Sequence, residues 1–167
     1  MNIGLAAFKR KCYVEAEKLY QQSLEFARKM NNPYRMGCVL QNLGMLERTR
    51  NHELAAETYL QESLEIAYKM GHAWLISETL CEWGELYLNQ KKLDEACKAF
   101  EQALAKAHAM EAAELMAMSK FGLARVAFLQ GNLPLAQRQG AESLCLFQSM
   151  EHAEVSRVAQ WLQQAFF

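Results

Sequence analysis

The sequence predicts an all-α protein, a right-handed α-solenoid of antiparallel helix pairs. Three observations predict it. The chain repeats itself at an interval of 40 residues without insertions. Apolar residues recur every three or four positions, which places them on one face of a helix. With only 2 prolines and 8 glycines among its 167 residues, the chain leaves no room for a flexible linker.

The repeat is visible in four columns of residues, each with a step of 40. The columns are Gly4, Gly44, Gly84 and Ala124; Ala16, Ala56, Ala96 and Ala136; Leu24, Leu64, Leu104 and Leu144; and Met30, Met70, Met110 and Met150. Internal repetition at such a period is the signature of a stacked helical array.

The small residues in these columns have a packing role. A glycine or alanine in the first helix of a pair, and an alanine early in the second, let the two helix axes approach closely. A large residue one turn later (Tyr20, Leu60 or Phe100) fills the space toward the next pair. Because a lone pair cannot bury its apolar stripe, each pair needs a stacked neighbour.

We expect one domain, 1–167, with a truncated first unit (1–30), three complete units (31–70, 71–110 and 111–150) and a terminal helix (151–166). The helices are expected at about 1–9, 13–30, 33–50, 53–70, 73–90, 91–110, 112–130, 133–150 and 151–165. Pro33 and Pro134 suit the first turns of their helices, and Gly71 suits a C-terminal cap. Since only three residues precede Gly4, we expect the chain to be a fragment of a longer protein.

The run Trp83-Gly84-x-x-Tyr87, followed by Ala96, Phe100 and Ala103, resembles the tetratricopeptide repeat. The usual period of that family is about 34 residues. The spacing here is similar to the longer-helix variety of bacterial signalling and transcription regulators and of kinesin light chains. The third complete unit departs from the pattern, because Ala124 replaces the glycine and Gly140 stands where the aromatic residue belongs.

Composition excludes several functional classes. With 18 basic and 19 acidic residues the net charge is −1, and the signs are interspersed, so a nucleic-acid partner is not expected. No apolar run approaches the length of a membrane span and no signal peptide is evident, so we expect a cytoplasmic protein without a membrane partner. The 5 cysteines lack metal-binding spacing and are expected to be reduced thiols.

Neither a catalytic nor a metal site is predicted. His52 and His108 have no carboxylate or cysteine at ligand spacing on the same helix face. His72 and His152 lie two units apart. The glutamate-rich segments carry nearby lysines and arginines, as solvated helix faces do. We therefore expect no enzyme activity, no metal and no cofactor.

The resemblance implies that the first helices of the pairs line a concave, partner-binding surface. The candidate residues on that face are Gln41, Met45, Arg48, Cys81, Glu85, Leu88, Asn89, Phe121, Arg125, Phe128 and Trp161. Relatives that grip a C-terminal carboxylate use Lys, Asn and Arg there. No such lysine is present here, so we do not expect that clamp.

Two interpretations of this face stay open. In one, Arg48, Glu85 and Arg125 pair with each other, and each exposed pair adds roughly 0.2–1 kcal/mol. In the other, these three residues, together with Gln41 and Asn89, position an extended or helical peptide.

The predicted function is a non-catalytic protein-interaction or sensor module of a larger regulator. The alternatives are a receptor for a signalling peptide or small ligand, and a homodimer formed through the apolar C-terminal end. Gly140 would leave space for Trp161 to pack inward and so reduce the apolar patch at that end. Five residues give that end its apolar character: Met118, Phe121, Phe128, Val158 and Trp161.

Overall fold

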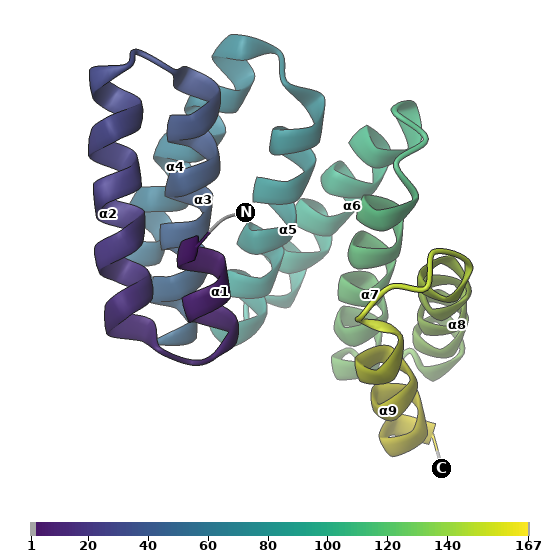
Figure 1. Cartoon of the computed structure of the whole chain (residues 1–167). Helices are drawn as coiled ribbons and strands as arrows, with labels where there is room; N and C mark the ends of the chain where they lie inside the picture. Colours follow the sequence, from purple (N-terminus) through teal and green to yellow (C-terminus); the bar gives the residue numbers. More distant parts are fainter. Residues whose placement is uncertain (1–2, 167) are drawn as a thin grey trace. The chain divides into compact units, whose positions relative to one another are not determined.

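The computed structural model describes residues 3–166, and all the regular structure in that range is helical (Figure 1). The described helices are α1 (Ile3–Lys9), α2 (Tyr13–Lys29), α3 (Pro33–Thr49), α4 (Glu53–Met70), α5 (Ala73–Asn89), α6 (Leu93–Ala109), α7 (Ala113–Leu129), α8 (Leu133–Ser149) and α9 (Val155–Phe166). The predicted all-α class is confirmed. Residues 1 and 2 of the expected first segment and residue 167 of the expected domain lie outside the described range.

The chain divides into two compact units, Met1–Glu82 and Trp83–Phe167, and the boundary falls within α5. In the first unit α1 packs on α2, α2 on α3, and α3 on α4. In the second, α6 packs on α7, α7 on α8, and α8 on α9. Each unit is therefore a series of sequential helix hairpins. A single domain spanning 1–167 stays a prediction.

The turns between the helices share one backbone geometry. The residue after the positive-φ position of a turn donates its N–H to the carbonyl five positions earlier, as Asn32 does to Ala27 (3.0 Å) and Ala112 to Ala107 (2.9 Å). This bond satisfies one of the carbonyls left open at a helix end. In the described range the positive-φ residues follow a step of 20: Lys11, Asn31, Asn51, Gly71, Lys91, Glu111, Gly131 and Glu151.

The helix boundaries follow from these turns. Pro33 and Pro134 lie in the first turns of their helices, and Gly71 is a left-handed cap, as predicted. The last helix was expected from Glu151 but begins at Val155. The reason is local: Glu151 has φ 51°, and the N–H of Glu154 donates to Nδ1 of His152 at 3.2 Å. Residues 151–154 are thereby held in a turn.

The core of the first unit lies where large side chains meet small ones. A Cβ on Gly44 would lie 2.6 Å from the Leu60 side chain and 3.5 Å from the Ala56 carbonyl oxygen. One 40-residue repeat earlier, a Cβ on Gly4 would lie 2.6 Å from the Tyr20 ring. Only a residue without a side chain fits at either glycine, so the small-residue columns mark real close approaches.

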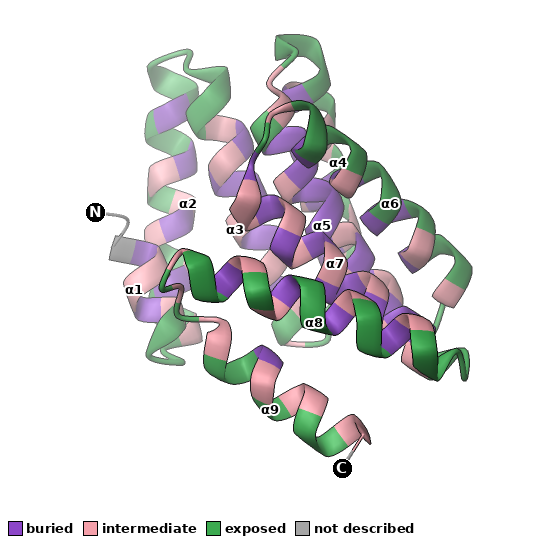
Figure 2. Cartoon of the chain, turned by 90° about the vertical axis from the view of Figure 1, so that its right-hand side faces the viewer, coloured by how far each residue is buried: buried purple, intermediate pink, exposed green. Residues whose placement is uncertain are grey.

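In the second unit, Phe100 of α6 fills the space over two glycines, Gly84 on α5 and Gly122 on α7. Gly140 of α8 faces Leu162 and Trp161 of α9, which pack where the repeat would otherwise place an aromatic ring. Figure 2 shows that buried residues alternate with exposed residues along α6 and α8, as expected for helices with one packed face and one outer face.

Tyr20 carries a hydroxyl without a hydrogen-bond partner among the described residues, although the residue is only 1% exposed. Burial raises the pKa of Tyr20 from 10.0 to about 12. Because the folded pKa lies above the unfolded one, the contribution of this group to stability is complete below pH 10. It declines as the pH rises toward 12.

We predict that Tyr20→Phe leaves the free energy of unfolding at pH 8 unchanged, or raises it by up to about 1 kcal/mol, since it removes an unsatisfied buried hydroxyl. Above pH 10 the wild type should lose stability relative to the variant by roughly 1.4 kcal/mol per pH unit. Urea unfolding of both proteins from about pH 8 to 11 measures this. A loss above about 1 kcal/mol at pH 8 would show that the hydroxyl has a partner.

Candidate functional site

The predicted binding residues lie on α3, α5, α7 and α9, with different degrees of exposure. Four are buried: Gln41, Cys81, Leu88 and Phe121. The remaining seven are half-buried or exposed: Met45, Arg48, Glu85, Asn89, Arg125, Phe128 and Trp161.

In the first unit, Arg48 pairs with Glu82, one turn before the expected partner Glu85. The guanidinium donates from Nη2 (3.0 Å) and Nε (3.3 Å) to one carboxylate oxygen of Glu82. The two side chains are only 17% and 11% exposed. This ion pair ties α3 to α5 and is better shielded from water than a surface pair.

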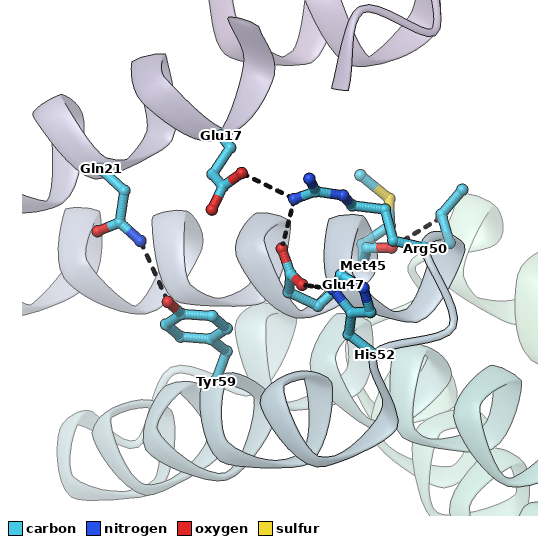
Figure 3. Close-up of polar contacts among 8 residues, drawn as sticks. Glu17, Gln21, Met45, Glu47, Arg50, His52 and Tyr59 are labelled. Carbon is cyan, nitrogen blue, oxygen red and sulfur yellow. Dashed lines mark hydrogen bonds and ion pairs between the residues drawn. The ribbon is translucent and has the colours of Figure 1, made fainter. Parts of the chain in front are cut away.

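A second polar cluster, which the sequence analysis did not identify, lies beside α3 (Figure 3). The buried carboxylate of Glu47 accepts from Arg50 (3.2 Å) and pairs with Nδ1 of His52 (2.7 Å). Arg50 also donates to Glu17 of α2 (2.7 Å), and this hydrogen bond raises the pKa of the guanidinium. The cluster fixes the α3–α4 turn against α2. Because Glu17 lies on another helix, no sequence motif signals the cluster.

The second unit holds an open cavity of about 380 Å³ between α5, α7 and α9. Four of its lining residues were predicted from the sequence. Arg157, Gln160 and Gln164 were not, because the matching positions of the preceding repeat include small, fully buried residues such as Ala117 and Ala124. The complete lining is Glu85, Phe121, Arg125, Arg157, Gln160, Trp161 and Gln164.

The cavity combines aromatic surface with fixed charge. Arg125 donates to Glu85, which was one of the predicted pairings. The guanidinium carbons of Arg125 and Arg157 lie 5.6 and 5.1 Å from the centre of the Phe121 ring, within the range of cation–π contacts. The Trp161 ring meets Phe121 edge-on at 5.5 Å. The lining is thus largely preorganised.

Three further observations bear on the chemistry of the described residues. No group of three or more His, Cys, Asp or Glu side chains in that part of the chain could hold a metal ion. None of the described helices is both long and apolar enough to cross a membrane. Burial raises the pKa of the Cys38 and Cys97 thiols, which disfavours the reactive thiolate.

Sequential helix hairpins, small residues at the crossings and a lined cavity define a helical-repeat protein. Models of the tetratricopeptide repeat match residues 1–69 and 77–110, which together exceed half of the chain. The chain belongs to the tetratricopeptide repeat family. Repeats of this family are generally protein–protein interaction modules. The matches do not distinguish the 40-residue variety, which stays a prediction.

A solved structure supports the same fold. The chain is similar to BtubC (BKLC) from P. vanneervenii, with a TM-score of 0.73 and 16% sequence identity. The similarity covers 89% of this chain and 62% of that chain, so this chain spans less than two thirds of the other. At this identity the likeness concerns the fold alone. No curated protein matches the sequence significantly.

We predict that Arg48→Met lowers the free energy of unfolding by about 2–3 kcal/mol, because it leaves the Glu82 carboxylate poorly solvated and without this cation. Replacing both residues, as Arg48→Met with Glu82→Leu, should recover most of the loss. Urea unfolding of the three proteins measures both effects. A loss below about 0.5 kcal/mol in the single variant would mean that the pair is no more than a surface contact.

Proposed function

We propose that this chain is a non-catalytic interaction module of a larger cytoplasmic regulator, and that it binds a peptide or protein segment at the cavity of the second unit. The observation that carries the proposal is the convergence of Arg125, Arg157 and Trp161 on one open, preformed space. The family supports protein binding in general, and the 40-residue spacing supports a regulator as the parent.

The lining suits a peptide for two reasons. The half-buried Trp161 ring, which packs on the buried Phe121 ring, offers apolar surface to a side chain. Gln160 and Gln164 offer amide groups to a peptide backbone. Each arginine of the lining has about five N–H donors on its guanidinium, more than one carboxylate partner can occupy. A carbonyl or carboxylate of the partner can therefore be bound without breaking the existing pairs.

A receptor for a small ligand or signalling peptide is the second candidate. The cavity volume of about 380 Å³ falls within the common range of small-molecule sites, roughly 300–1,000 Å³. Self-association through the C-terminal end has less support, since Phe121 and Val158 are buried and Trp161 packs beside Gly140. Sedimentation across a concentration series tests it directly.

We predict that exchanging the charges of one pair, as Glu85→Arg with Arg125→Glu, weakens peptide binding by at least about tenfold. The exchange keeps an ion pair but reverses the charge that faces the ligand. Peptides selected from a displayed random library on the full chain provide the probe, and fluorescence polarisation measures their affinity.

Lys98→Glu on α6, outside the cavity lining, serves as the control for a general charge effect and should leave the affinity unchanged. Circular dichroism should show the same helicity in all variants. Unaltered binding by the exchanged protein would remove the cavity from the proposal.

A further inference from the structure

Large apolar side chains are exposed at one end of the first unit. Of the ten exposed large hydrophobic residues in the described part of the chain, six lie at or next to the α2–α3 and α4–α5 turns, and they are 39–63% exposed. These six, which we call the aromatic edge, are Phe26, Met30, Tyr34, Tyr68, Met70 and Trp74.

The two turns lie at the same end of this unit, as Figure 1 shows for the junctions of α2 with α3 and of α4 with α5. Side chains connect them. The rings of Tyr34 and His72 lie 4.7 Å apart, and Nδ1 of His72 accepts from the N–H of Leu75 at 3.2 Å. The contact of Tyr34 with His72 therefore joins the α2–α3 turn to the α4–α5 turn.

The charge within the two turn segments has a single sign. Residues 26–35 and 66–75 contain no aspartate or glutamate. Their four basic residues are Arg28, Lys29, Arg35 and Lys69.

The carboxylates near the edge belong to neighbouring helical turns. Glu62 pairs with Arg28 at 3.5 Å, and Glu78 acts electrostatically on Tyr34. Glu25 and Glu65 directly precede the two segments, and Glu65 accepts a hydrogen bond from Gln61 at 2.9 Å. The turn segments themselves therefore present positive charge beside the exposed apolar side chains.

The repeat itself does not require this surface. The equivalent segments of the second unit, 106–115 and 146–155, contain one residue of the Phe, Tyr and Trp types, Phe147, which is fully buried. Since the same turns form without exposed aromatic rings, packing does not account for the edge. Those segments also contain four glutamates: Glu111, Glu114, Glu151 and Glu154.

We propose that the aromatic edge binds an acidic segment of a partner protein that also carries large apolar side chains. Its aromatic, methionine and arginine content is typical of protein interfaces. The absence of acidic residues from the two segments is complementary to an acidic partner. The site is separate from the cavity residues of the proposed function.

The geometry favours a protein segment over a lipid surface. The α2–α3 turn is short, with only three residues between Lys29 and Pro33, so the apolar side chains lie on helix ends and flanks. Tyr34 is held laterally by its ring contact with His72. A fixed surface of this kind suits a shaped partner, whereas membrane insertion relies on apolar groups that sink into the lipid interface.

The test selects peptides from a displayed random library for binding to the full chain. Peptides that fail to bind the double variant Tyr34→Ala with Trp74→Ala are then sorted out as edge-dependent. We expect the edge-dependent peptides to be acidic and to contain large apolar residues. Their affinity should fall at least about tenfold for Lys29→Glu with Lys69→Glu. It should be unchanged for Lys106→Glu, an exposed lysine in the last turn of α6, and for the Glu85–Arg125 exchange.

Three outcomes would overturn the proposal. In the first, the selection yields no peptide whose binding depends on the edge. In the second, it yields such peptides but they lack acidic residues. In the third, no such peptide is found, and phosphatidylglycerol vesicles bind the wild type but not the edge variants. Because the edge and the cavity are probed by different substitutions, either can fail while the other stands. Circular dichroism and thermal unfolding confirm that each variant is folded.

Discussion

The close approach of paired helices is the constraint on which the rest of this structure depends. A Cβ on Gly44 would lie 2.6 Å from the Leu60 side chain and within van der Waals contact of the Ala56 carbonyl oxygen, at 3.5 Å. Such proximity lets large residues such as Leu60 and Phe100 pack directly against the glycines of the facing helices. The position of Ala56 holds a fully buried alanine in the second helix of every pair: Ala16, Ala56, Ala96 and Ala136.

Much of this fold could be predicted because packing constrains residue type at fixed intervals. The turns could not be predicted in the same way. Their positive-φ residues recur every 20 positions. Several of them, such as Lys91 and Glu111, are not glycine, so their residue type does not predict a left-handed conformation. A left-handed conformation costs such residues roughly 1–2 kcal/mol, which the hydrogen bonds and packing of the hairpin offset. Gly122 could not be predicted as a packing position because it lies outside the glycine column, although Phe100 packs against it.

The candidate site was predicted only in part, for a similar reason. The step of 40 residues placed Glu85 and Arg125 on one face, and they pair. It could not show that Arg48 bonds to Glu82, because a shift of one helical turn is decided by side-chain reach. Nor could it include Arg157, because the position 40 residues earlier holds Ala117, which is fully buried. Specific surfaces in this protein thus arise where the chain departs from its own repeat.

The most direct test of the packing account compares one substitution at two positions of α6. Ala96 is fully buried at the crossing, and Ala105 lies on the exposed face of the same helix. The account predicts that Ala96→Leu lowers the free energy of unfolding by about 1–3 kcal/mol through overpacking. Ala105→Leu should change it by less than about 0.5 kcal/mol. Urea unfolding measures both changes. If both substitutions changed the free energy of unfolding by the same small amount, the claim that small residues are required at the helix crossings would be wrong.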